Sequence, residues 1–175
     1  GSKQILVDCG LFQGLKELRL KNWDRFPVDP KSIDAIVLTH AHIDHSGFIP
    51  SLVKEGFRGR IYCTRATLAL CKILLPDAGH IQEEEAEYLA RRNRSKHNPP
   101  LPLFTKEEAE KSLEYFAAKD FEQEFEIAPD IRAHFRYAGH ILGAASAIIK
   151  AGSTTIAFSG DVGRMNDLIF KHPAS

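Results

Sequence analysis

Four side chains that commonly bind metal ions follow directly on an apolar segment with the composition of a buried strand. The segment is residues 35–39, and the side chains are His40, His42, Asp44 and His45. A buried strand is rigid, so side chains at its C-terminal edge are held in fixed directions above the sheet. Because only Ala41 and Ile43 separate the four, the pattern predicts a metal site rather than a solvated histidine-rich loop.

The spacing of these side chains divides them into two pairs. In an extended segment His40 and His42 project to the same side and can bind one ion, while a turn lets Asp44 and His45 reach a second. Two imidazoles do not complete a tetrahedral zinc site, so further ligands must come from other strand ends. The candidates are His140 and Asp161, because each follows a predicted strand and has glycines beside it that allow close backbone approach.

Short β-branched runs alternate with helical segments, which predicts an α/β architecture. Strands are expected over residues 4–8, 35–39, 60–63, 131–137, 145–150 and 154–159. Helices are expected from Ser46 as N-cap up to Gly56, over residues 64–75 with Pro76 as breaker, over residues 77–92, and over residues 106–116 after a Thr105–Glu108 capping box.

The composition is that of one globular domain over residues 1–175, since 43% of the chain is hydrophobic. The 23 basic and 23 acidic residues give a net charge of zero, which provides no overall attraction for nucleic acid. A polyanion would therefore need a local patch or bound cations. The strongest basic run, residues 91–97, is interpreted as a solvated helix end in preference to an RNA contact.

Cysteine usage and hydropathy indicate the compartment. Cys9, Cys63 and Cys71 are odd in number and widely spaced, which favours buried reduced thiols over disulfides or a thiolate zinc site. The longest apolar stretch is too short to span a bilayer, and no signal peptide pattern opens the chain. These features predict a cytoplasmic protein without a membrane partner.

The sequence HAHIDHSG at residues 40–47 resembles the signature motif of the metallo-β-lactamase superfamily. Three further segments are similar to its RNA- and DNA-processing branch, the β-CASP nucleases. They are DCGLFQG at residues 8–14, AGH at 138–140 followed by GAAS at 143–146, and SGDVG at 159–163. The resemblance covers residues 4–163 and implies the metallo-β-lactamase fold, an αββα sandwich of mixed sheets.

The resemblance also implies two zinc ions. The implied ligands are His40, His42 and His140 for the first ion, Asp44 and His45 for the second, and Asp161 for both. It makes Asp44 and Asp161 the catalytic residues, while Asp8 matches a family aspartate that orders the loops near the site without binding metal. A hydroxide shared by the cations would be the nucleophile, because metals lower its pKa and offset the charge on a phosphate.

The implied function is hydrolysis of phosphodiester bonds in RNA, with RNA favoured over DNA as the partner. Thiolesterases and lactonases share the first motif, so one alternative is a hydrolase of small esters or thioesters with the same dinuclear site. The other is a metal-binding scaffold without activity.

Family members carry parts that this chain does not contain. They have strands before the Asp8 motif, an inserted β-CASP cap after the bridging aspartate, C-terminal strands and a last histidine ligand for the second metal. We therefore expect an incomplete copy of the fold, a weak or empty second zinc site, a general acid outside the chain, and little activity of the chain alone.

Overall fold

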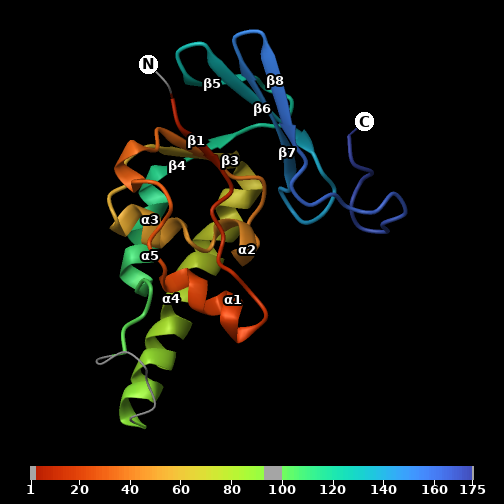
Figure 1. The fold of residues 1–175 in the computed structure, drawn as a ribbon. Helices are drawn as coiled ribbons and strands as arrows, with labels where there is room; N and C mark the ends of the chain where they lie inside the picture. The colour runs from red at the N-terminus through yellow and green to blue at the C-terminus, as the bar shows by residue number, and fades with distance from the viewer. Residues whose placement is uncertain (1–2, 93–99, 175) are drawn as a thin grey trace.

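The computed structural model describes residues 3–92 and 100–174, which form two four-stranded sheets packed on one another (Figure 1). The first sheet is wholly parallel, in the order β1 (Ile5–Val7), β2 (Ala35–Val37), β3 (Arg60–Thr64) and β4 (Phe116–Lys119). The second is an antiparallel meander of β5 (Phe125–Ala128), β6 (Ile131–Tyr137), β7 (Ala145–Ala151) and β8 (Thr154–Phe158). Among these strands, parallel pairing is therefore confined to the first sheet and antiparallel pairing to the second.

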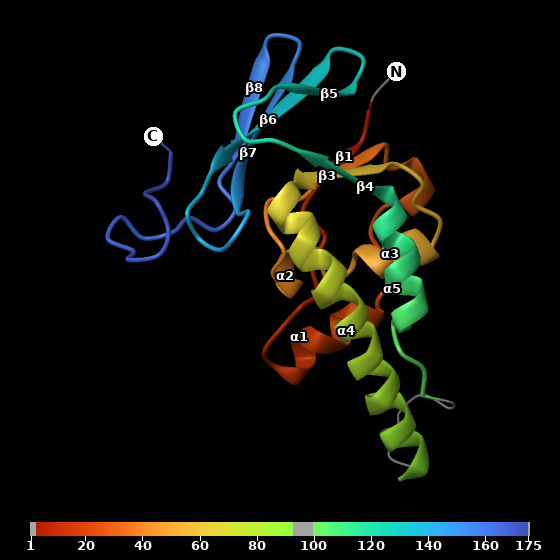
Figure 2. The same cartoon turned by 180° about the vertical axis from the view of Figure 1, so that it is seen from behind.

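The helices cover the face of the first sheet that points away from the second, as the two views in Figures 1 and 2 show. They are α1 (Lys16–Leu20), α2 (Ile43–Ser46), α3 (Ile49–Lys54), α4 (Arg65–Arg91) and α5 (Lys106–Ser112), with short 3-10 turns at Lys21–Trp23, Pro30–Ser32 and Leu113–Tyr115. The described residues thus form a helix layer and two sheet layers of the predicted αββα sandwich.

Strand β2 lies between two hydrophobic cores. Ile36 and Leu38 belong to the core shared with the helices, whereas Val37 belongs to the core between the sheets, where it joins Phe135 and Ala147. Alternate residues of a strand face opposite sides, so burial on both sides requires the uninterrupted apolar run that the sequence shows. The segment that carries the metal-binding motif is consequently anchored in the most buried part of the molecule.

Three predicted helix boundaries are wrong. The helix predicted to reach Phe116 ends as α5 at Ser112, and Phe116 begins β4. Pro76 does not interrupt the second helix, because α4 continues from Arg65 to Arg91. A proline inside a helix costs about 3 kcal/mol. Here it is offset by tertiary packing, since Cys71, Leu75 and Gly79 are buried along one face of α4. Ser46 is not an N-cap but the last residue of α2, where its hydroxyl donates to the Ala41 carbonyl at 2.9 Å.

Four helices and strands of the described chain were not predicted, namely α1, α2, β4 and β5. Strand β4 contains two alanines and β5 a glutamate, so neither has a strong strand composition, and their pairing with β3 and β6 decides the structure. The capping box is confirmed, because the Thr105 hydroxyl accepts from the Glu108 amide at 3.1 Å. The three cysteines are buried and free, as predicted. Of the basic run, residues 93–97 lie outside the described residues.

Candidate metal centre

The HxHxDH segment leaves the buried end of β2 and turns into the single helical turn of α2. Its first histidine, His40, is fully buried, whereas its single carboxylate, Asp44, is largely exposed. The pKa of His40 is lowered to about 4, mainly by burial and also by the nearby imidazoles of His45 and His42. The ring is therefore neutral near neutral pH, which is the form of histidine that binds metal ions.

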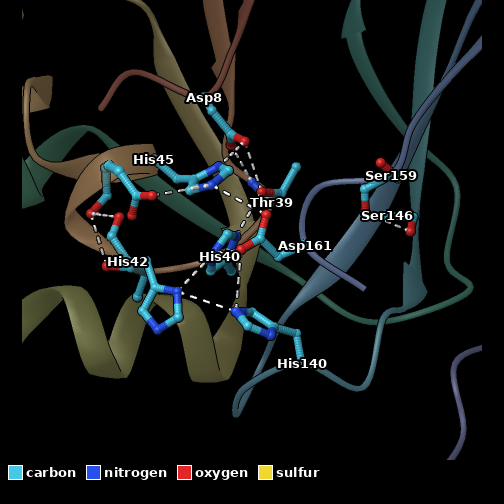
Figure 3. Close-up of polar contacts among 12 residues, drawn as sticks. Asp8, Thr39, His40, His42, His45, His140, Ser146, Ser159 and Asp161 are labelled. Atoms are coloured by element: carbon cyan, nitrogen blue, oxygen red, sulfur yellow. Dashed lines mark hydrogen bonds and ion pairs between the residues drawn. The ribbon is translucent and has the colours of Figure 1, made fainter. Parts of the chain in front are cut away.

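Four side chains from three separate segments converge beside β2 (Figure 3). His40 Nε2 lies 3.1 Å from His42 Nδ1, which in turn lies 3.3 Å from His140 Nε2. Asp161 Oδ2 lies 3.4 Å from His140 Nε2 and 3.9 Å from His40 Nε2. One donor atom from each of the four residues lies within 4.8 Å of the others.

The chemistry of this donor set fits a zinc ion. Three imidazole nitrogens and one carboxylate oxygen are a common zinc ligand set, and such sites are usually tetrahedral. A neutral imidazole carries hydrogen on only one of its two nitrogens, so nitrogens that face one another include lone pairs without a hydrogen-bond donor. A cation bound among them would satisfy these converging lone pairs. The residues present are therefore suited to hold the metal that the sequence implies.

The second pair of predicted ligands lies beside this group. His45 Nε2 lies 3.5 Å from Asp161 Oδ1 and 4.0 Å from Asp44 Oδ2. Asp161 accordingly faces His140 with one carboxylate oxygen and His45 with the other. This division of its two oxygens is the geometry expected of a carboxylate shared by two ions.

Asp8 holds the end of β2 and His45 in place. Its Oδ1 accepts from the Thr39 amide at 2.7 Å, and its Oδ2 accepts from the Thr39 hydroxyl at 2.8 Å and contacts His45 Nδ1 at 2.7 Å. Asp8 has a φ of 58°, a left-handed conformation that is uncommon outside glycine but tolerated by aspartate. These contacts join Asp8 to the end of β2 and to His45, while its role in ordering the loops near the site stays a prediction.

The loop that carries His140 is fixed against the start of α4. The Gly143 carbonyl accepts from the Thr64 hydroxyl at 2.7 Å and from the Thr67 hydroxyl at 3.0 Å. A Cβ atom on Gly143 would lie 2.4 Å from the Thr67 amide nitrogen, so only glycine allows this approach. The loop is thereby held where His140 can face His42.

The structure brings four of the six predicted ligands into one group and places the other two, Asp44 and His45, next to it. That these six residues bind metal stays a prediction. Sequence reasoning missed Thr39, whose side chain contacts both Asp8 and His40. The available signal was a polar residue at the end of an otherwise apolar strand, immediately before the motif.

Comparison with known proteins identifies the family. The family model for the metallo-beta-lactamase superfamily matches residues 1–173. The chain is 34% identical to a ribonuclease of Thermus thermophilus, over 99% of this chain and 36% of that protein. It is 34% identical to transcription termination factor FttA of Methanothermobacter thermautotrophicus, over 91% of this chain and 24% of that protein.

A plant relative has a similar match. The chain is 33% identical to cleavage and polyadenylation specificity factor subunit 3-I of Arabidopsis thaliana, over 94% of this chain and 22% of that protein. The chain therefore spans 22% to 36% of the length of these three curated relatives.

A solved structure supports the fold. MEM-A1, a subclass B3 metallo-beta-lactamase from a soil metagenome library, matches with a TM-score of 0.50 and 17% identity, over 90% of this chain and 52% of that one. Within the described residues, every helix is too short or too polar to cross a membrane. The chain belongs to the metallo-β-lactamase superfamily, and its relatives agree with the resemblance to the β-CASP branch.

Proposed function

We propose that this protein is a zinc-dependent hydrolase that cleaves phosphodiester bonds in RNA. The observation that carries the proposal is the position of Asp161, which turns one carboxylate oxygen toward His140 and the other toward His45. A carboxylate in this position can bind two cations, and two-cation sites are well suited to displacement at phosphorus. One relative is named a ribonuclease and another a cleavage and polyadenylation factor subunit, which supports RNA over DNA as the substrate.

The proposed ligands are His40, His42, His140 and Asp161 for one ion and Asp44, His45 and Asp161 for the other. When bound, the cations would make a water molecule acidic enough to attack near neutral pH and would offset charge on the phosphate. The role of the protein is to hold these side chains in place before substrate arrives.

The two proposed catalytic carboxylates lie at the accessible side of the group. The Asp44 side chain is 57% exposed and that of Asp161 is 45% exposed, whereas His40 is buried behind them. A phosphodiester would therefore approach from the side of Asp44 and Asp161. Asp8, which is mostly buried, reaches the site only through the residues that it holds.

Two other functions share this donor set and are outcomes of the same test. One is hydrolysis of small esters or thioesters, and the other is a metal-binding scaffold without activity. We regard residues 1–175 as the catalytic core, and a cytoplasmic location stays a prediction.

The decisive experiment measures zinc content and cleavage of end-labelled RNA under single-turnover conditions. With the full-length protein, we expect RNA cleavage that a chelator and Asp161→Asn both abolish. Asp167→Asn is the matched control, because Asp167 follows Asp161 in the same segment and, among the described residues, accepts hydrogen bonds from the amides of Ile169 and Phe170. Intact RNA with hydrolysis of a thioester or lactone would replace the nuclease proposal, and bound zinc without any hydrolysis would overturn it.

A further inference from the structure

Thr39, the residue before His40, is fully buried and contacts several segments that form the site. Its amide donates to Asp8, and its carbonyl accepts from the Ala145 amide at 3.0 Å, which joins the end of β2 to the start of β7. A Cβ atom on Gly160 would lie 2.8 Å from the Thr39 Cβ, so the residue before Asp161 packs directly on this side chain. Thr39 is therefore in contact with the Asp8, His40 and Asp161 segments together.

The number of hydrogen-bond donors and acceptors around the Thr39 hydroxyl determines which atoms carry hydrogen. The hydroxyl carries one proton, which it donates to Asp8 Oδ2 at 2.8 Å. Its second short contact, at 3.0 Å, is with His40 Nδ1. Because the hydroxyl proton is already used, His40 must be the donor in this contact, so Nδ1 carries the hydrogen. The lone pair of His40 is then on Nε2, the atom that faces His42.

The same carboxylate oxygen of Asp8 also determines the tautomer of His45. His45 Nδ1 lies 2.7 Å from Asp8 Oδ2, and an ionised carboxylate only accepts, so His45 also carries its hydrogen on Nδ1. Its Nε2 lone pair then faces Asp161. A single carboxylate oxygen thus orients His45 directly and orients His40 through Thr39.

We propose that the Thr39 hydroxyl is a positioning group that fixes the tautomer and ring orientation of His40 and couples it, through Asp8, to His45. Hydrogen bonds of this kind to a metal-binding histidine hold the ring and raise its basicity, and their loss typically lowers metal affinity about 10- to 100-fold. The inference rests on the proposed metal site but not on RNA as the substrate.

The first test needs no substitution and no metal. Long-range proton–nitrogen NMR correlations of the metal-free chain near neutral pH report which nitrogen of His40 carries hydrogen. We expect the Nδ1–H tautomer in the unmodified chain and in Thr39→Ser, and its loss in Thr39→Val. An Nε2–H tautomer in the unmodified chain would overturn the proposal, and this measurement decides the matter even if Thr39→Val does not fold.

The second test measures zinc affinity by competition with a chelator. Thr39→Val keeps the shape of the side chain and removes the hydroxyl, so we expect affinity to fall about 10- to 100-fold. Thr39→Ser keeps the hydroxyl and should bind zinc nearly as the unmodified chain does. Thr155→Val, the same substitution on exposed β8, should have no effect. Equal losses in the Ser and Val variants would show a purely steric role and contradict the proposal.

These readouts separate the positioning role from the proposed function. Failure to cleave RNA leaves the tautomer and zinc results unchanged and counts only against the nuclease. Normal RNA cleavage together with unaltered zinc affinity in Thr39→Val counts only against the positioning role.

Discussion

Asp161 Oδ1 lies 3.5 Å from His45 Nε2, while the other oxygen of the same carboxylate lies 3.4 Å from His140 Nε2. Three segments far apart in the sequence thus meet at one side chain, the segment after β8, the loop after β6 and the turn after β2. Because each oxygen has a different histidine in front of it, the two oxygens have separable roles.

Asp161→Asn tests this separation. An amide retains one neutral ligand oxygen and replaces the other with a nitrogen that is a donor, so the side chain can no longer be shared by two cations. At zinc concentrations that fill the weak second site of the unmodified chain, we expect the variant to bind one zinc ion less, as measured by native mass spectrometry, with the fold intact by circular dichroism. Unchanged zinc stoichiometry would show that Asp161 does not bridge.

The positions of the proposed ligands could be predicted from sequence because they depend on local features. The apolar run before His40 requires a buried strand, and the glycines beside His140 and Asp161 mark places where the backbone turns close to other groups. A different local feature, the alternation of apolar and polar residues, placed β6 correctly at Ile131–Tyr137.

Other features depend on contacts between distant segments and could not be predicted from the local sequence. Pro76 remains helical because the buried face of α4 packs against the rest of the core. The positioning contacts of Thr39 arise only when the Asp8 and Gly160 segments fold against it. The sequence therefore predicts which side chains can bind metal better than it predicts which residues orient them.

Gly10→Ala should disrupt both stability and zinc binding. A Cβ atom at this position would lie 1.6 Å from the Asp44 carbonyl oxygen, and a backbone atom cannot move aside as a flexible side chain can. Overpacking of this kind costs about 1–3 kcal/mol or more in the free energy of unfolding. Because the clash is with Asp44, zinc affinity should also decrease. Urea unfolding and zinc titration measure the two effects.

Gly14→Ala is the control for this variant. Gly14 has a φ of +81°, and a Cβ atom added to it would have no neighbour within 4 Å. Alanine there suffers only the left-handed backbone cost of about 1–2 kcal/mol. We expect a moderate loss of stability with unchanged zinc affinity. If Gly14→Ala weakened zinc binding as much as Gly10→Ala, close packing against Asp44 would not be the cause.

The buried thiols should make the fold sensitive to alkaline pH. Burial raises the pKa of the Cys71 thiol to about 12 and also raises that of Cys63, which has Cys71 as a neighbour. An unfolded thiol ionises near 9.0, so the unfolded state is increasingly favoured as the pH rises from 9.0 toward 12. The stability from keeping these thiols neutral is fully present below pH 9.0 and is lost across that range.

Urea unfolding at a series of pH values measures this loss. We expect the decline above pH 9.0 to be shallower in Cys71→Ala than in the unmodified chain, because one ionising thiol has been removed. A thiol reagent should modify Cys71 slowly in the folded protein and rapidly in urea. Rapid modification of the folded protein, or identical pH profiles for the two chains, would contradict the burial argument.

Thr67→Val should weaken zinc binding through His140. The Thr67 hydroxyl donates to the Gly143 carbonyl at 3.0 Å, and valine keeps the shape of the side chain without this bond. Thr64 still donates to the same carbonyl at 2.7 Å, so the loop should loosen without detaching, at a cost of about 1 kcal/mol. We expect a corresponding decrease in zinc affinity.

A double-mutant cycle with His140→Ala identifies the route of this effect. Where His140 is already missing, the position of its loop no longer matters for the metal, so Thr67→Val should leave the residual zinc affinity unchanged. Zinc affinities of the unmodified chain, the two single variants and the double variant give the coupling energy directly. If Thr67→Val lowered zinc affinity equally in both backgrounds, Thr67 would act only on the stability of the fold and not through the loop that carries His140.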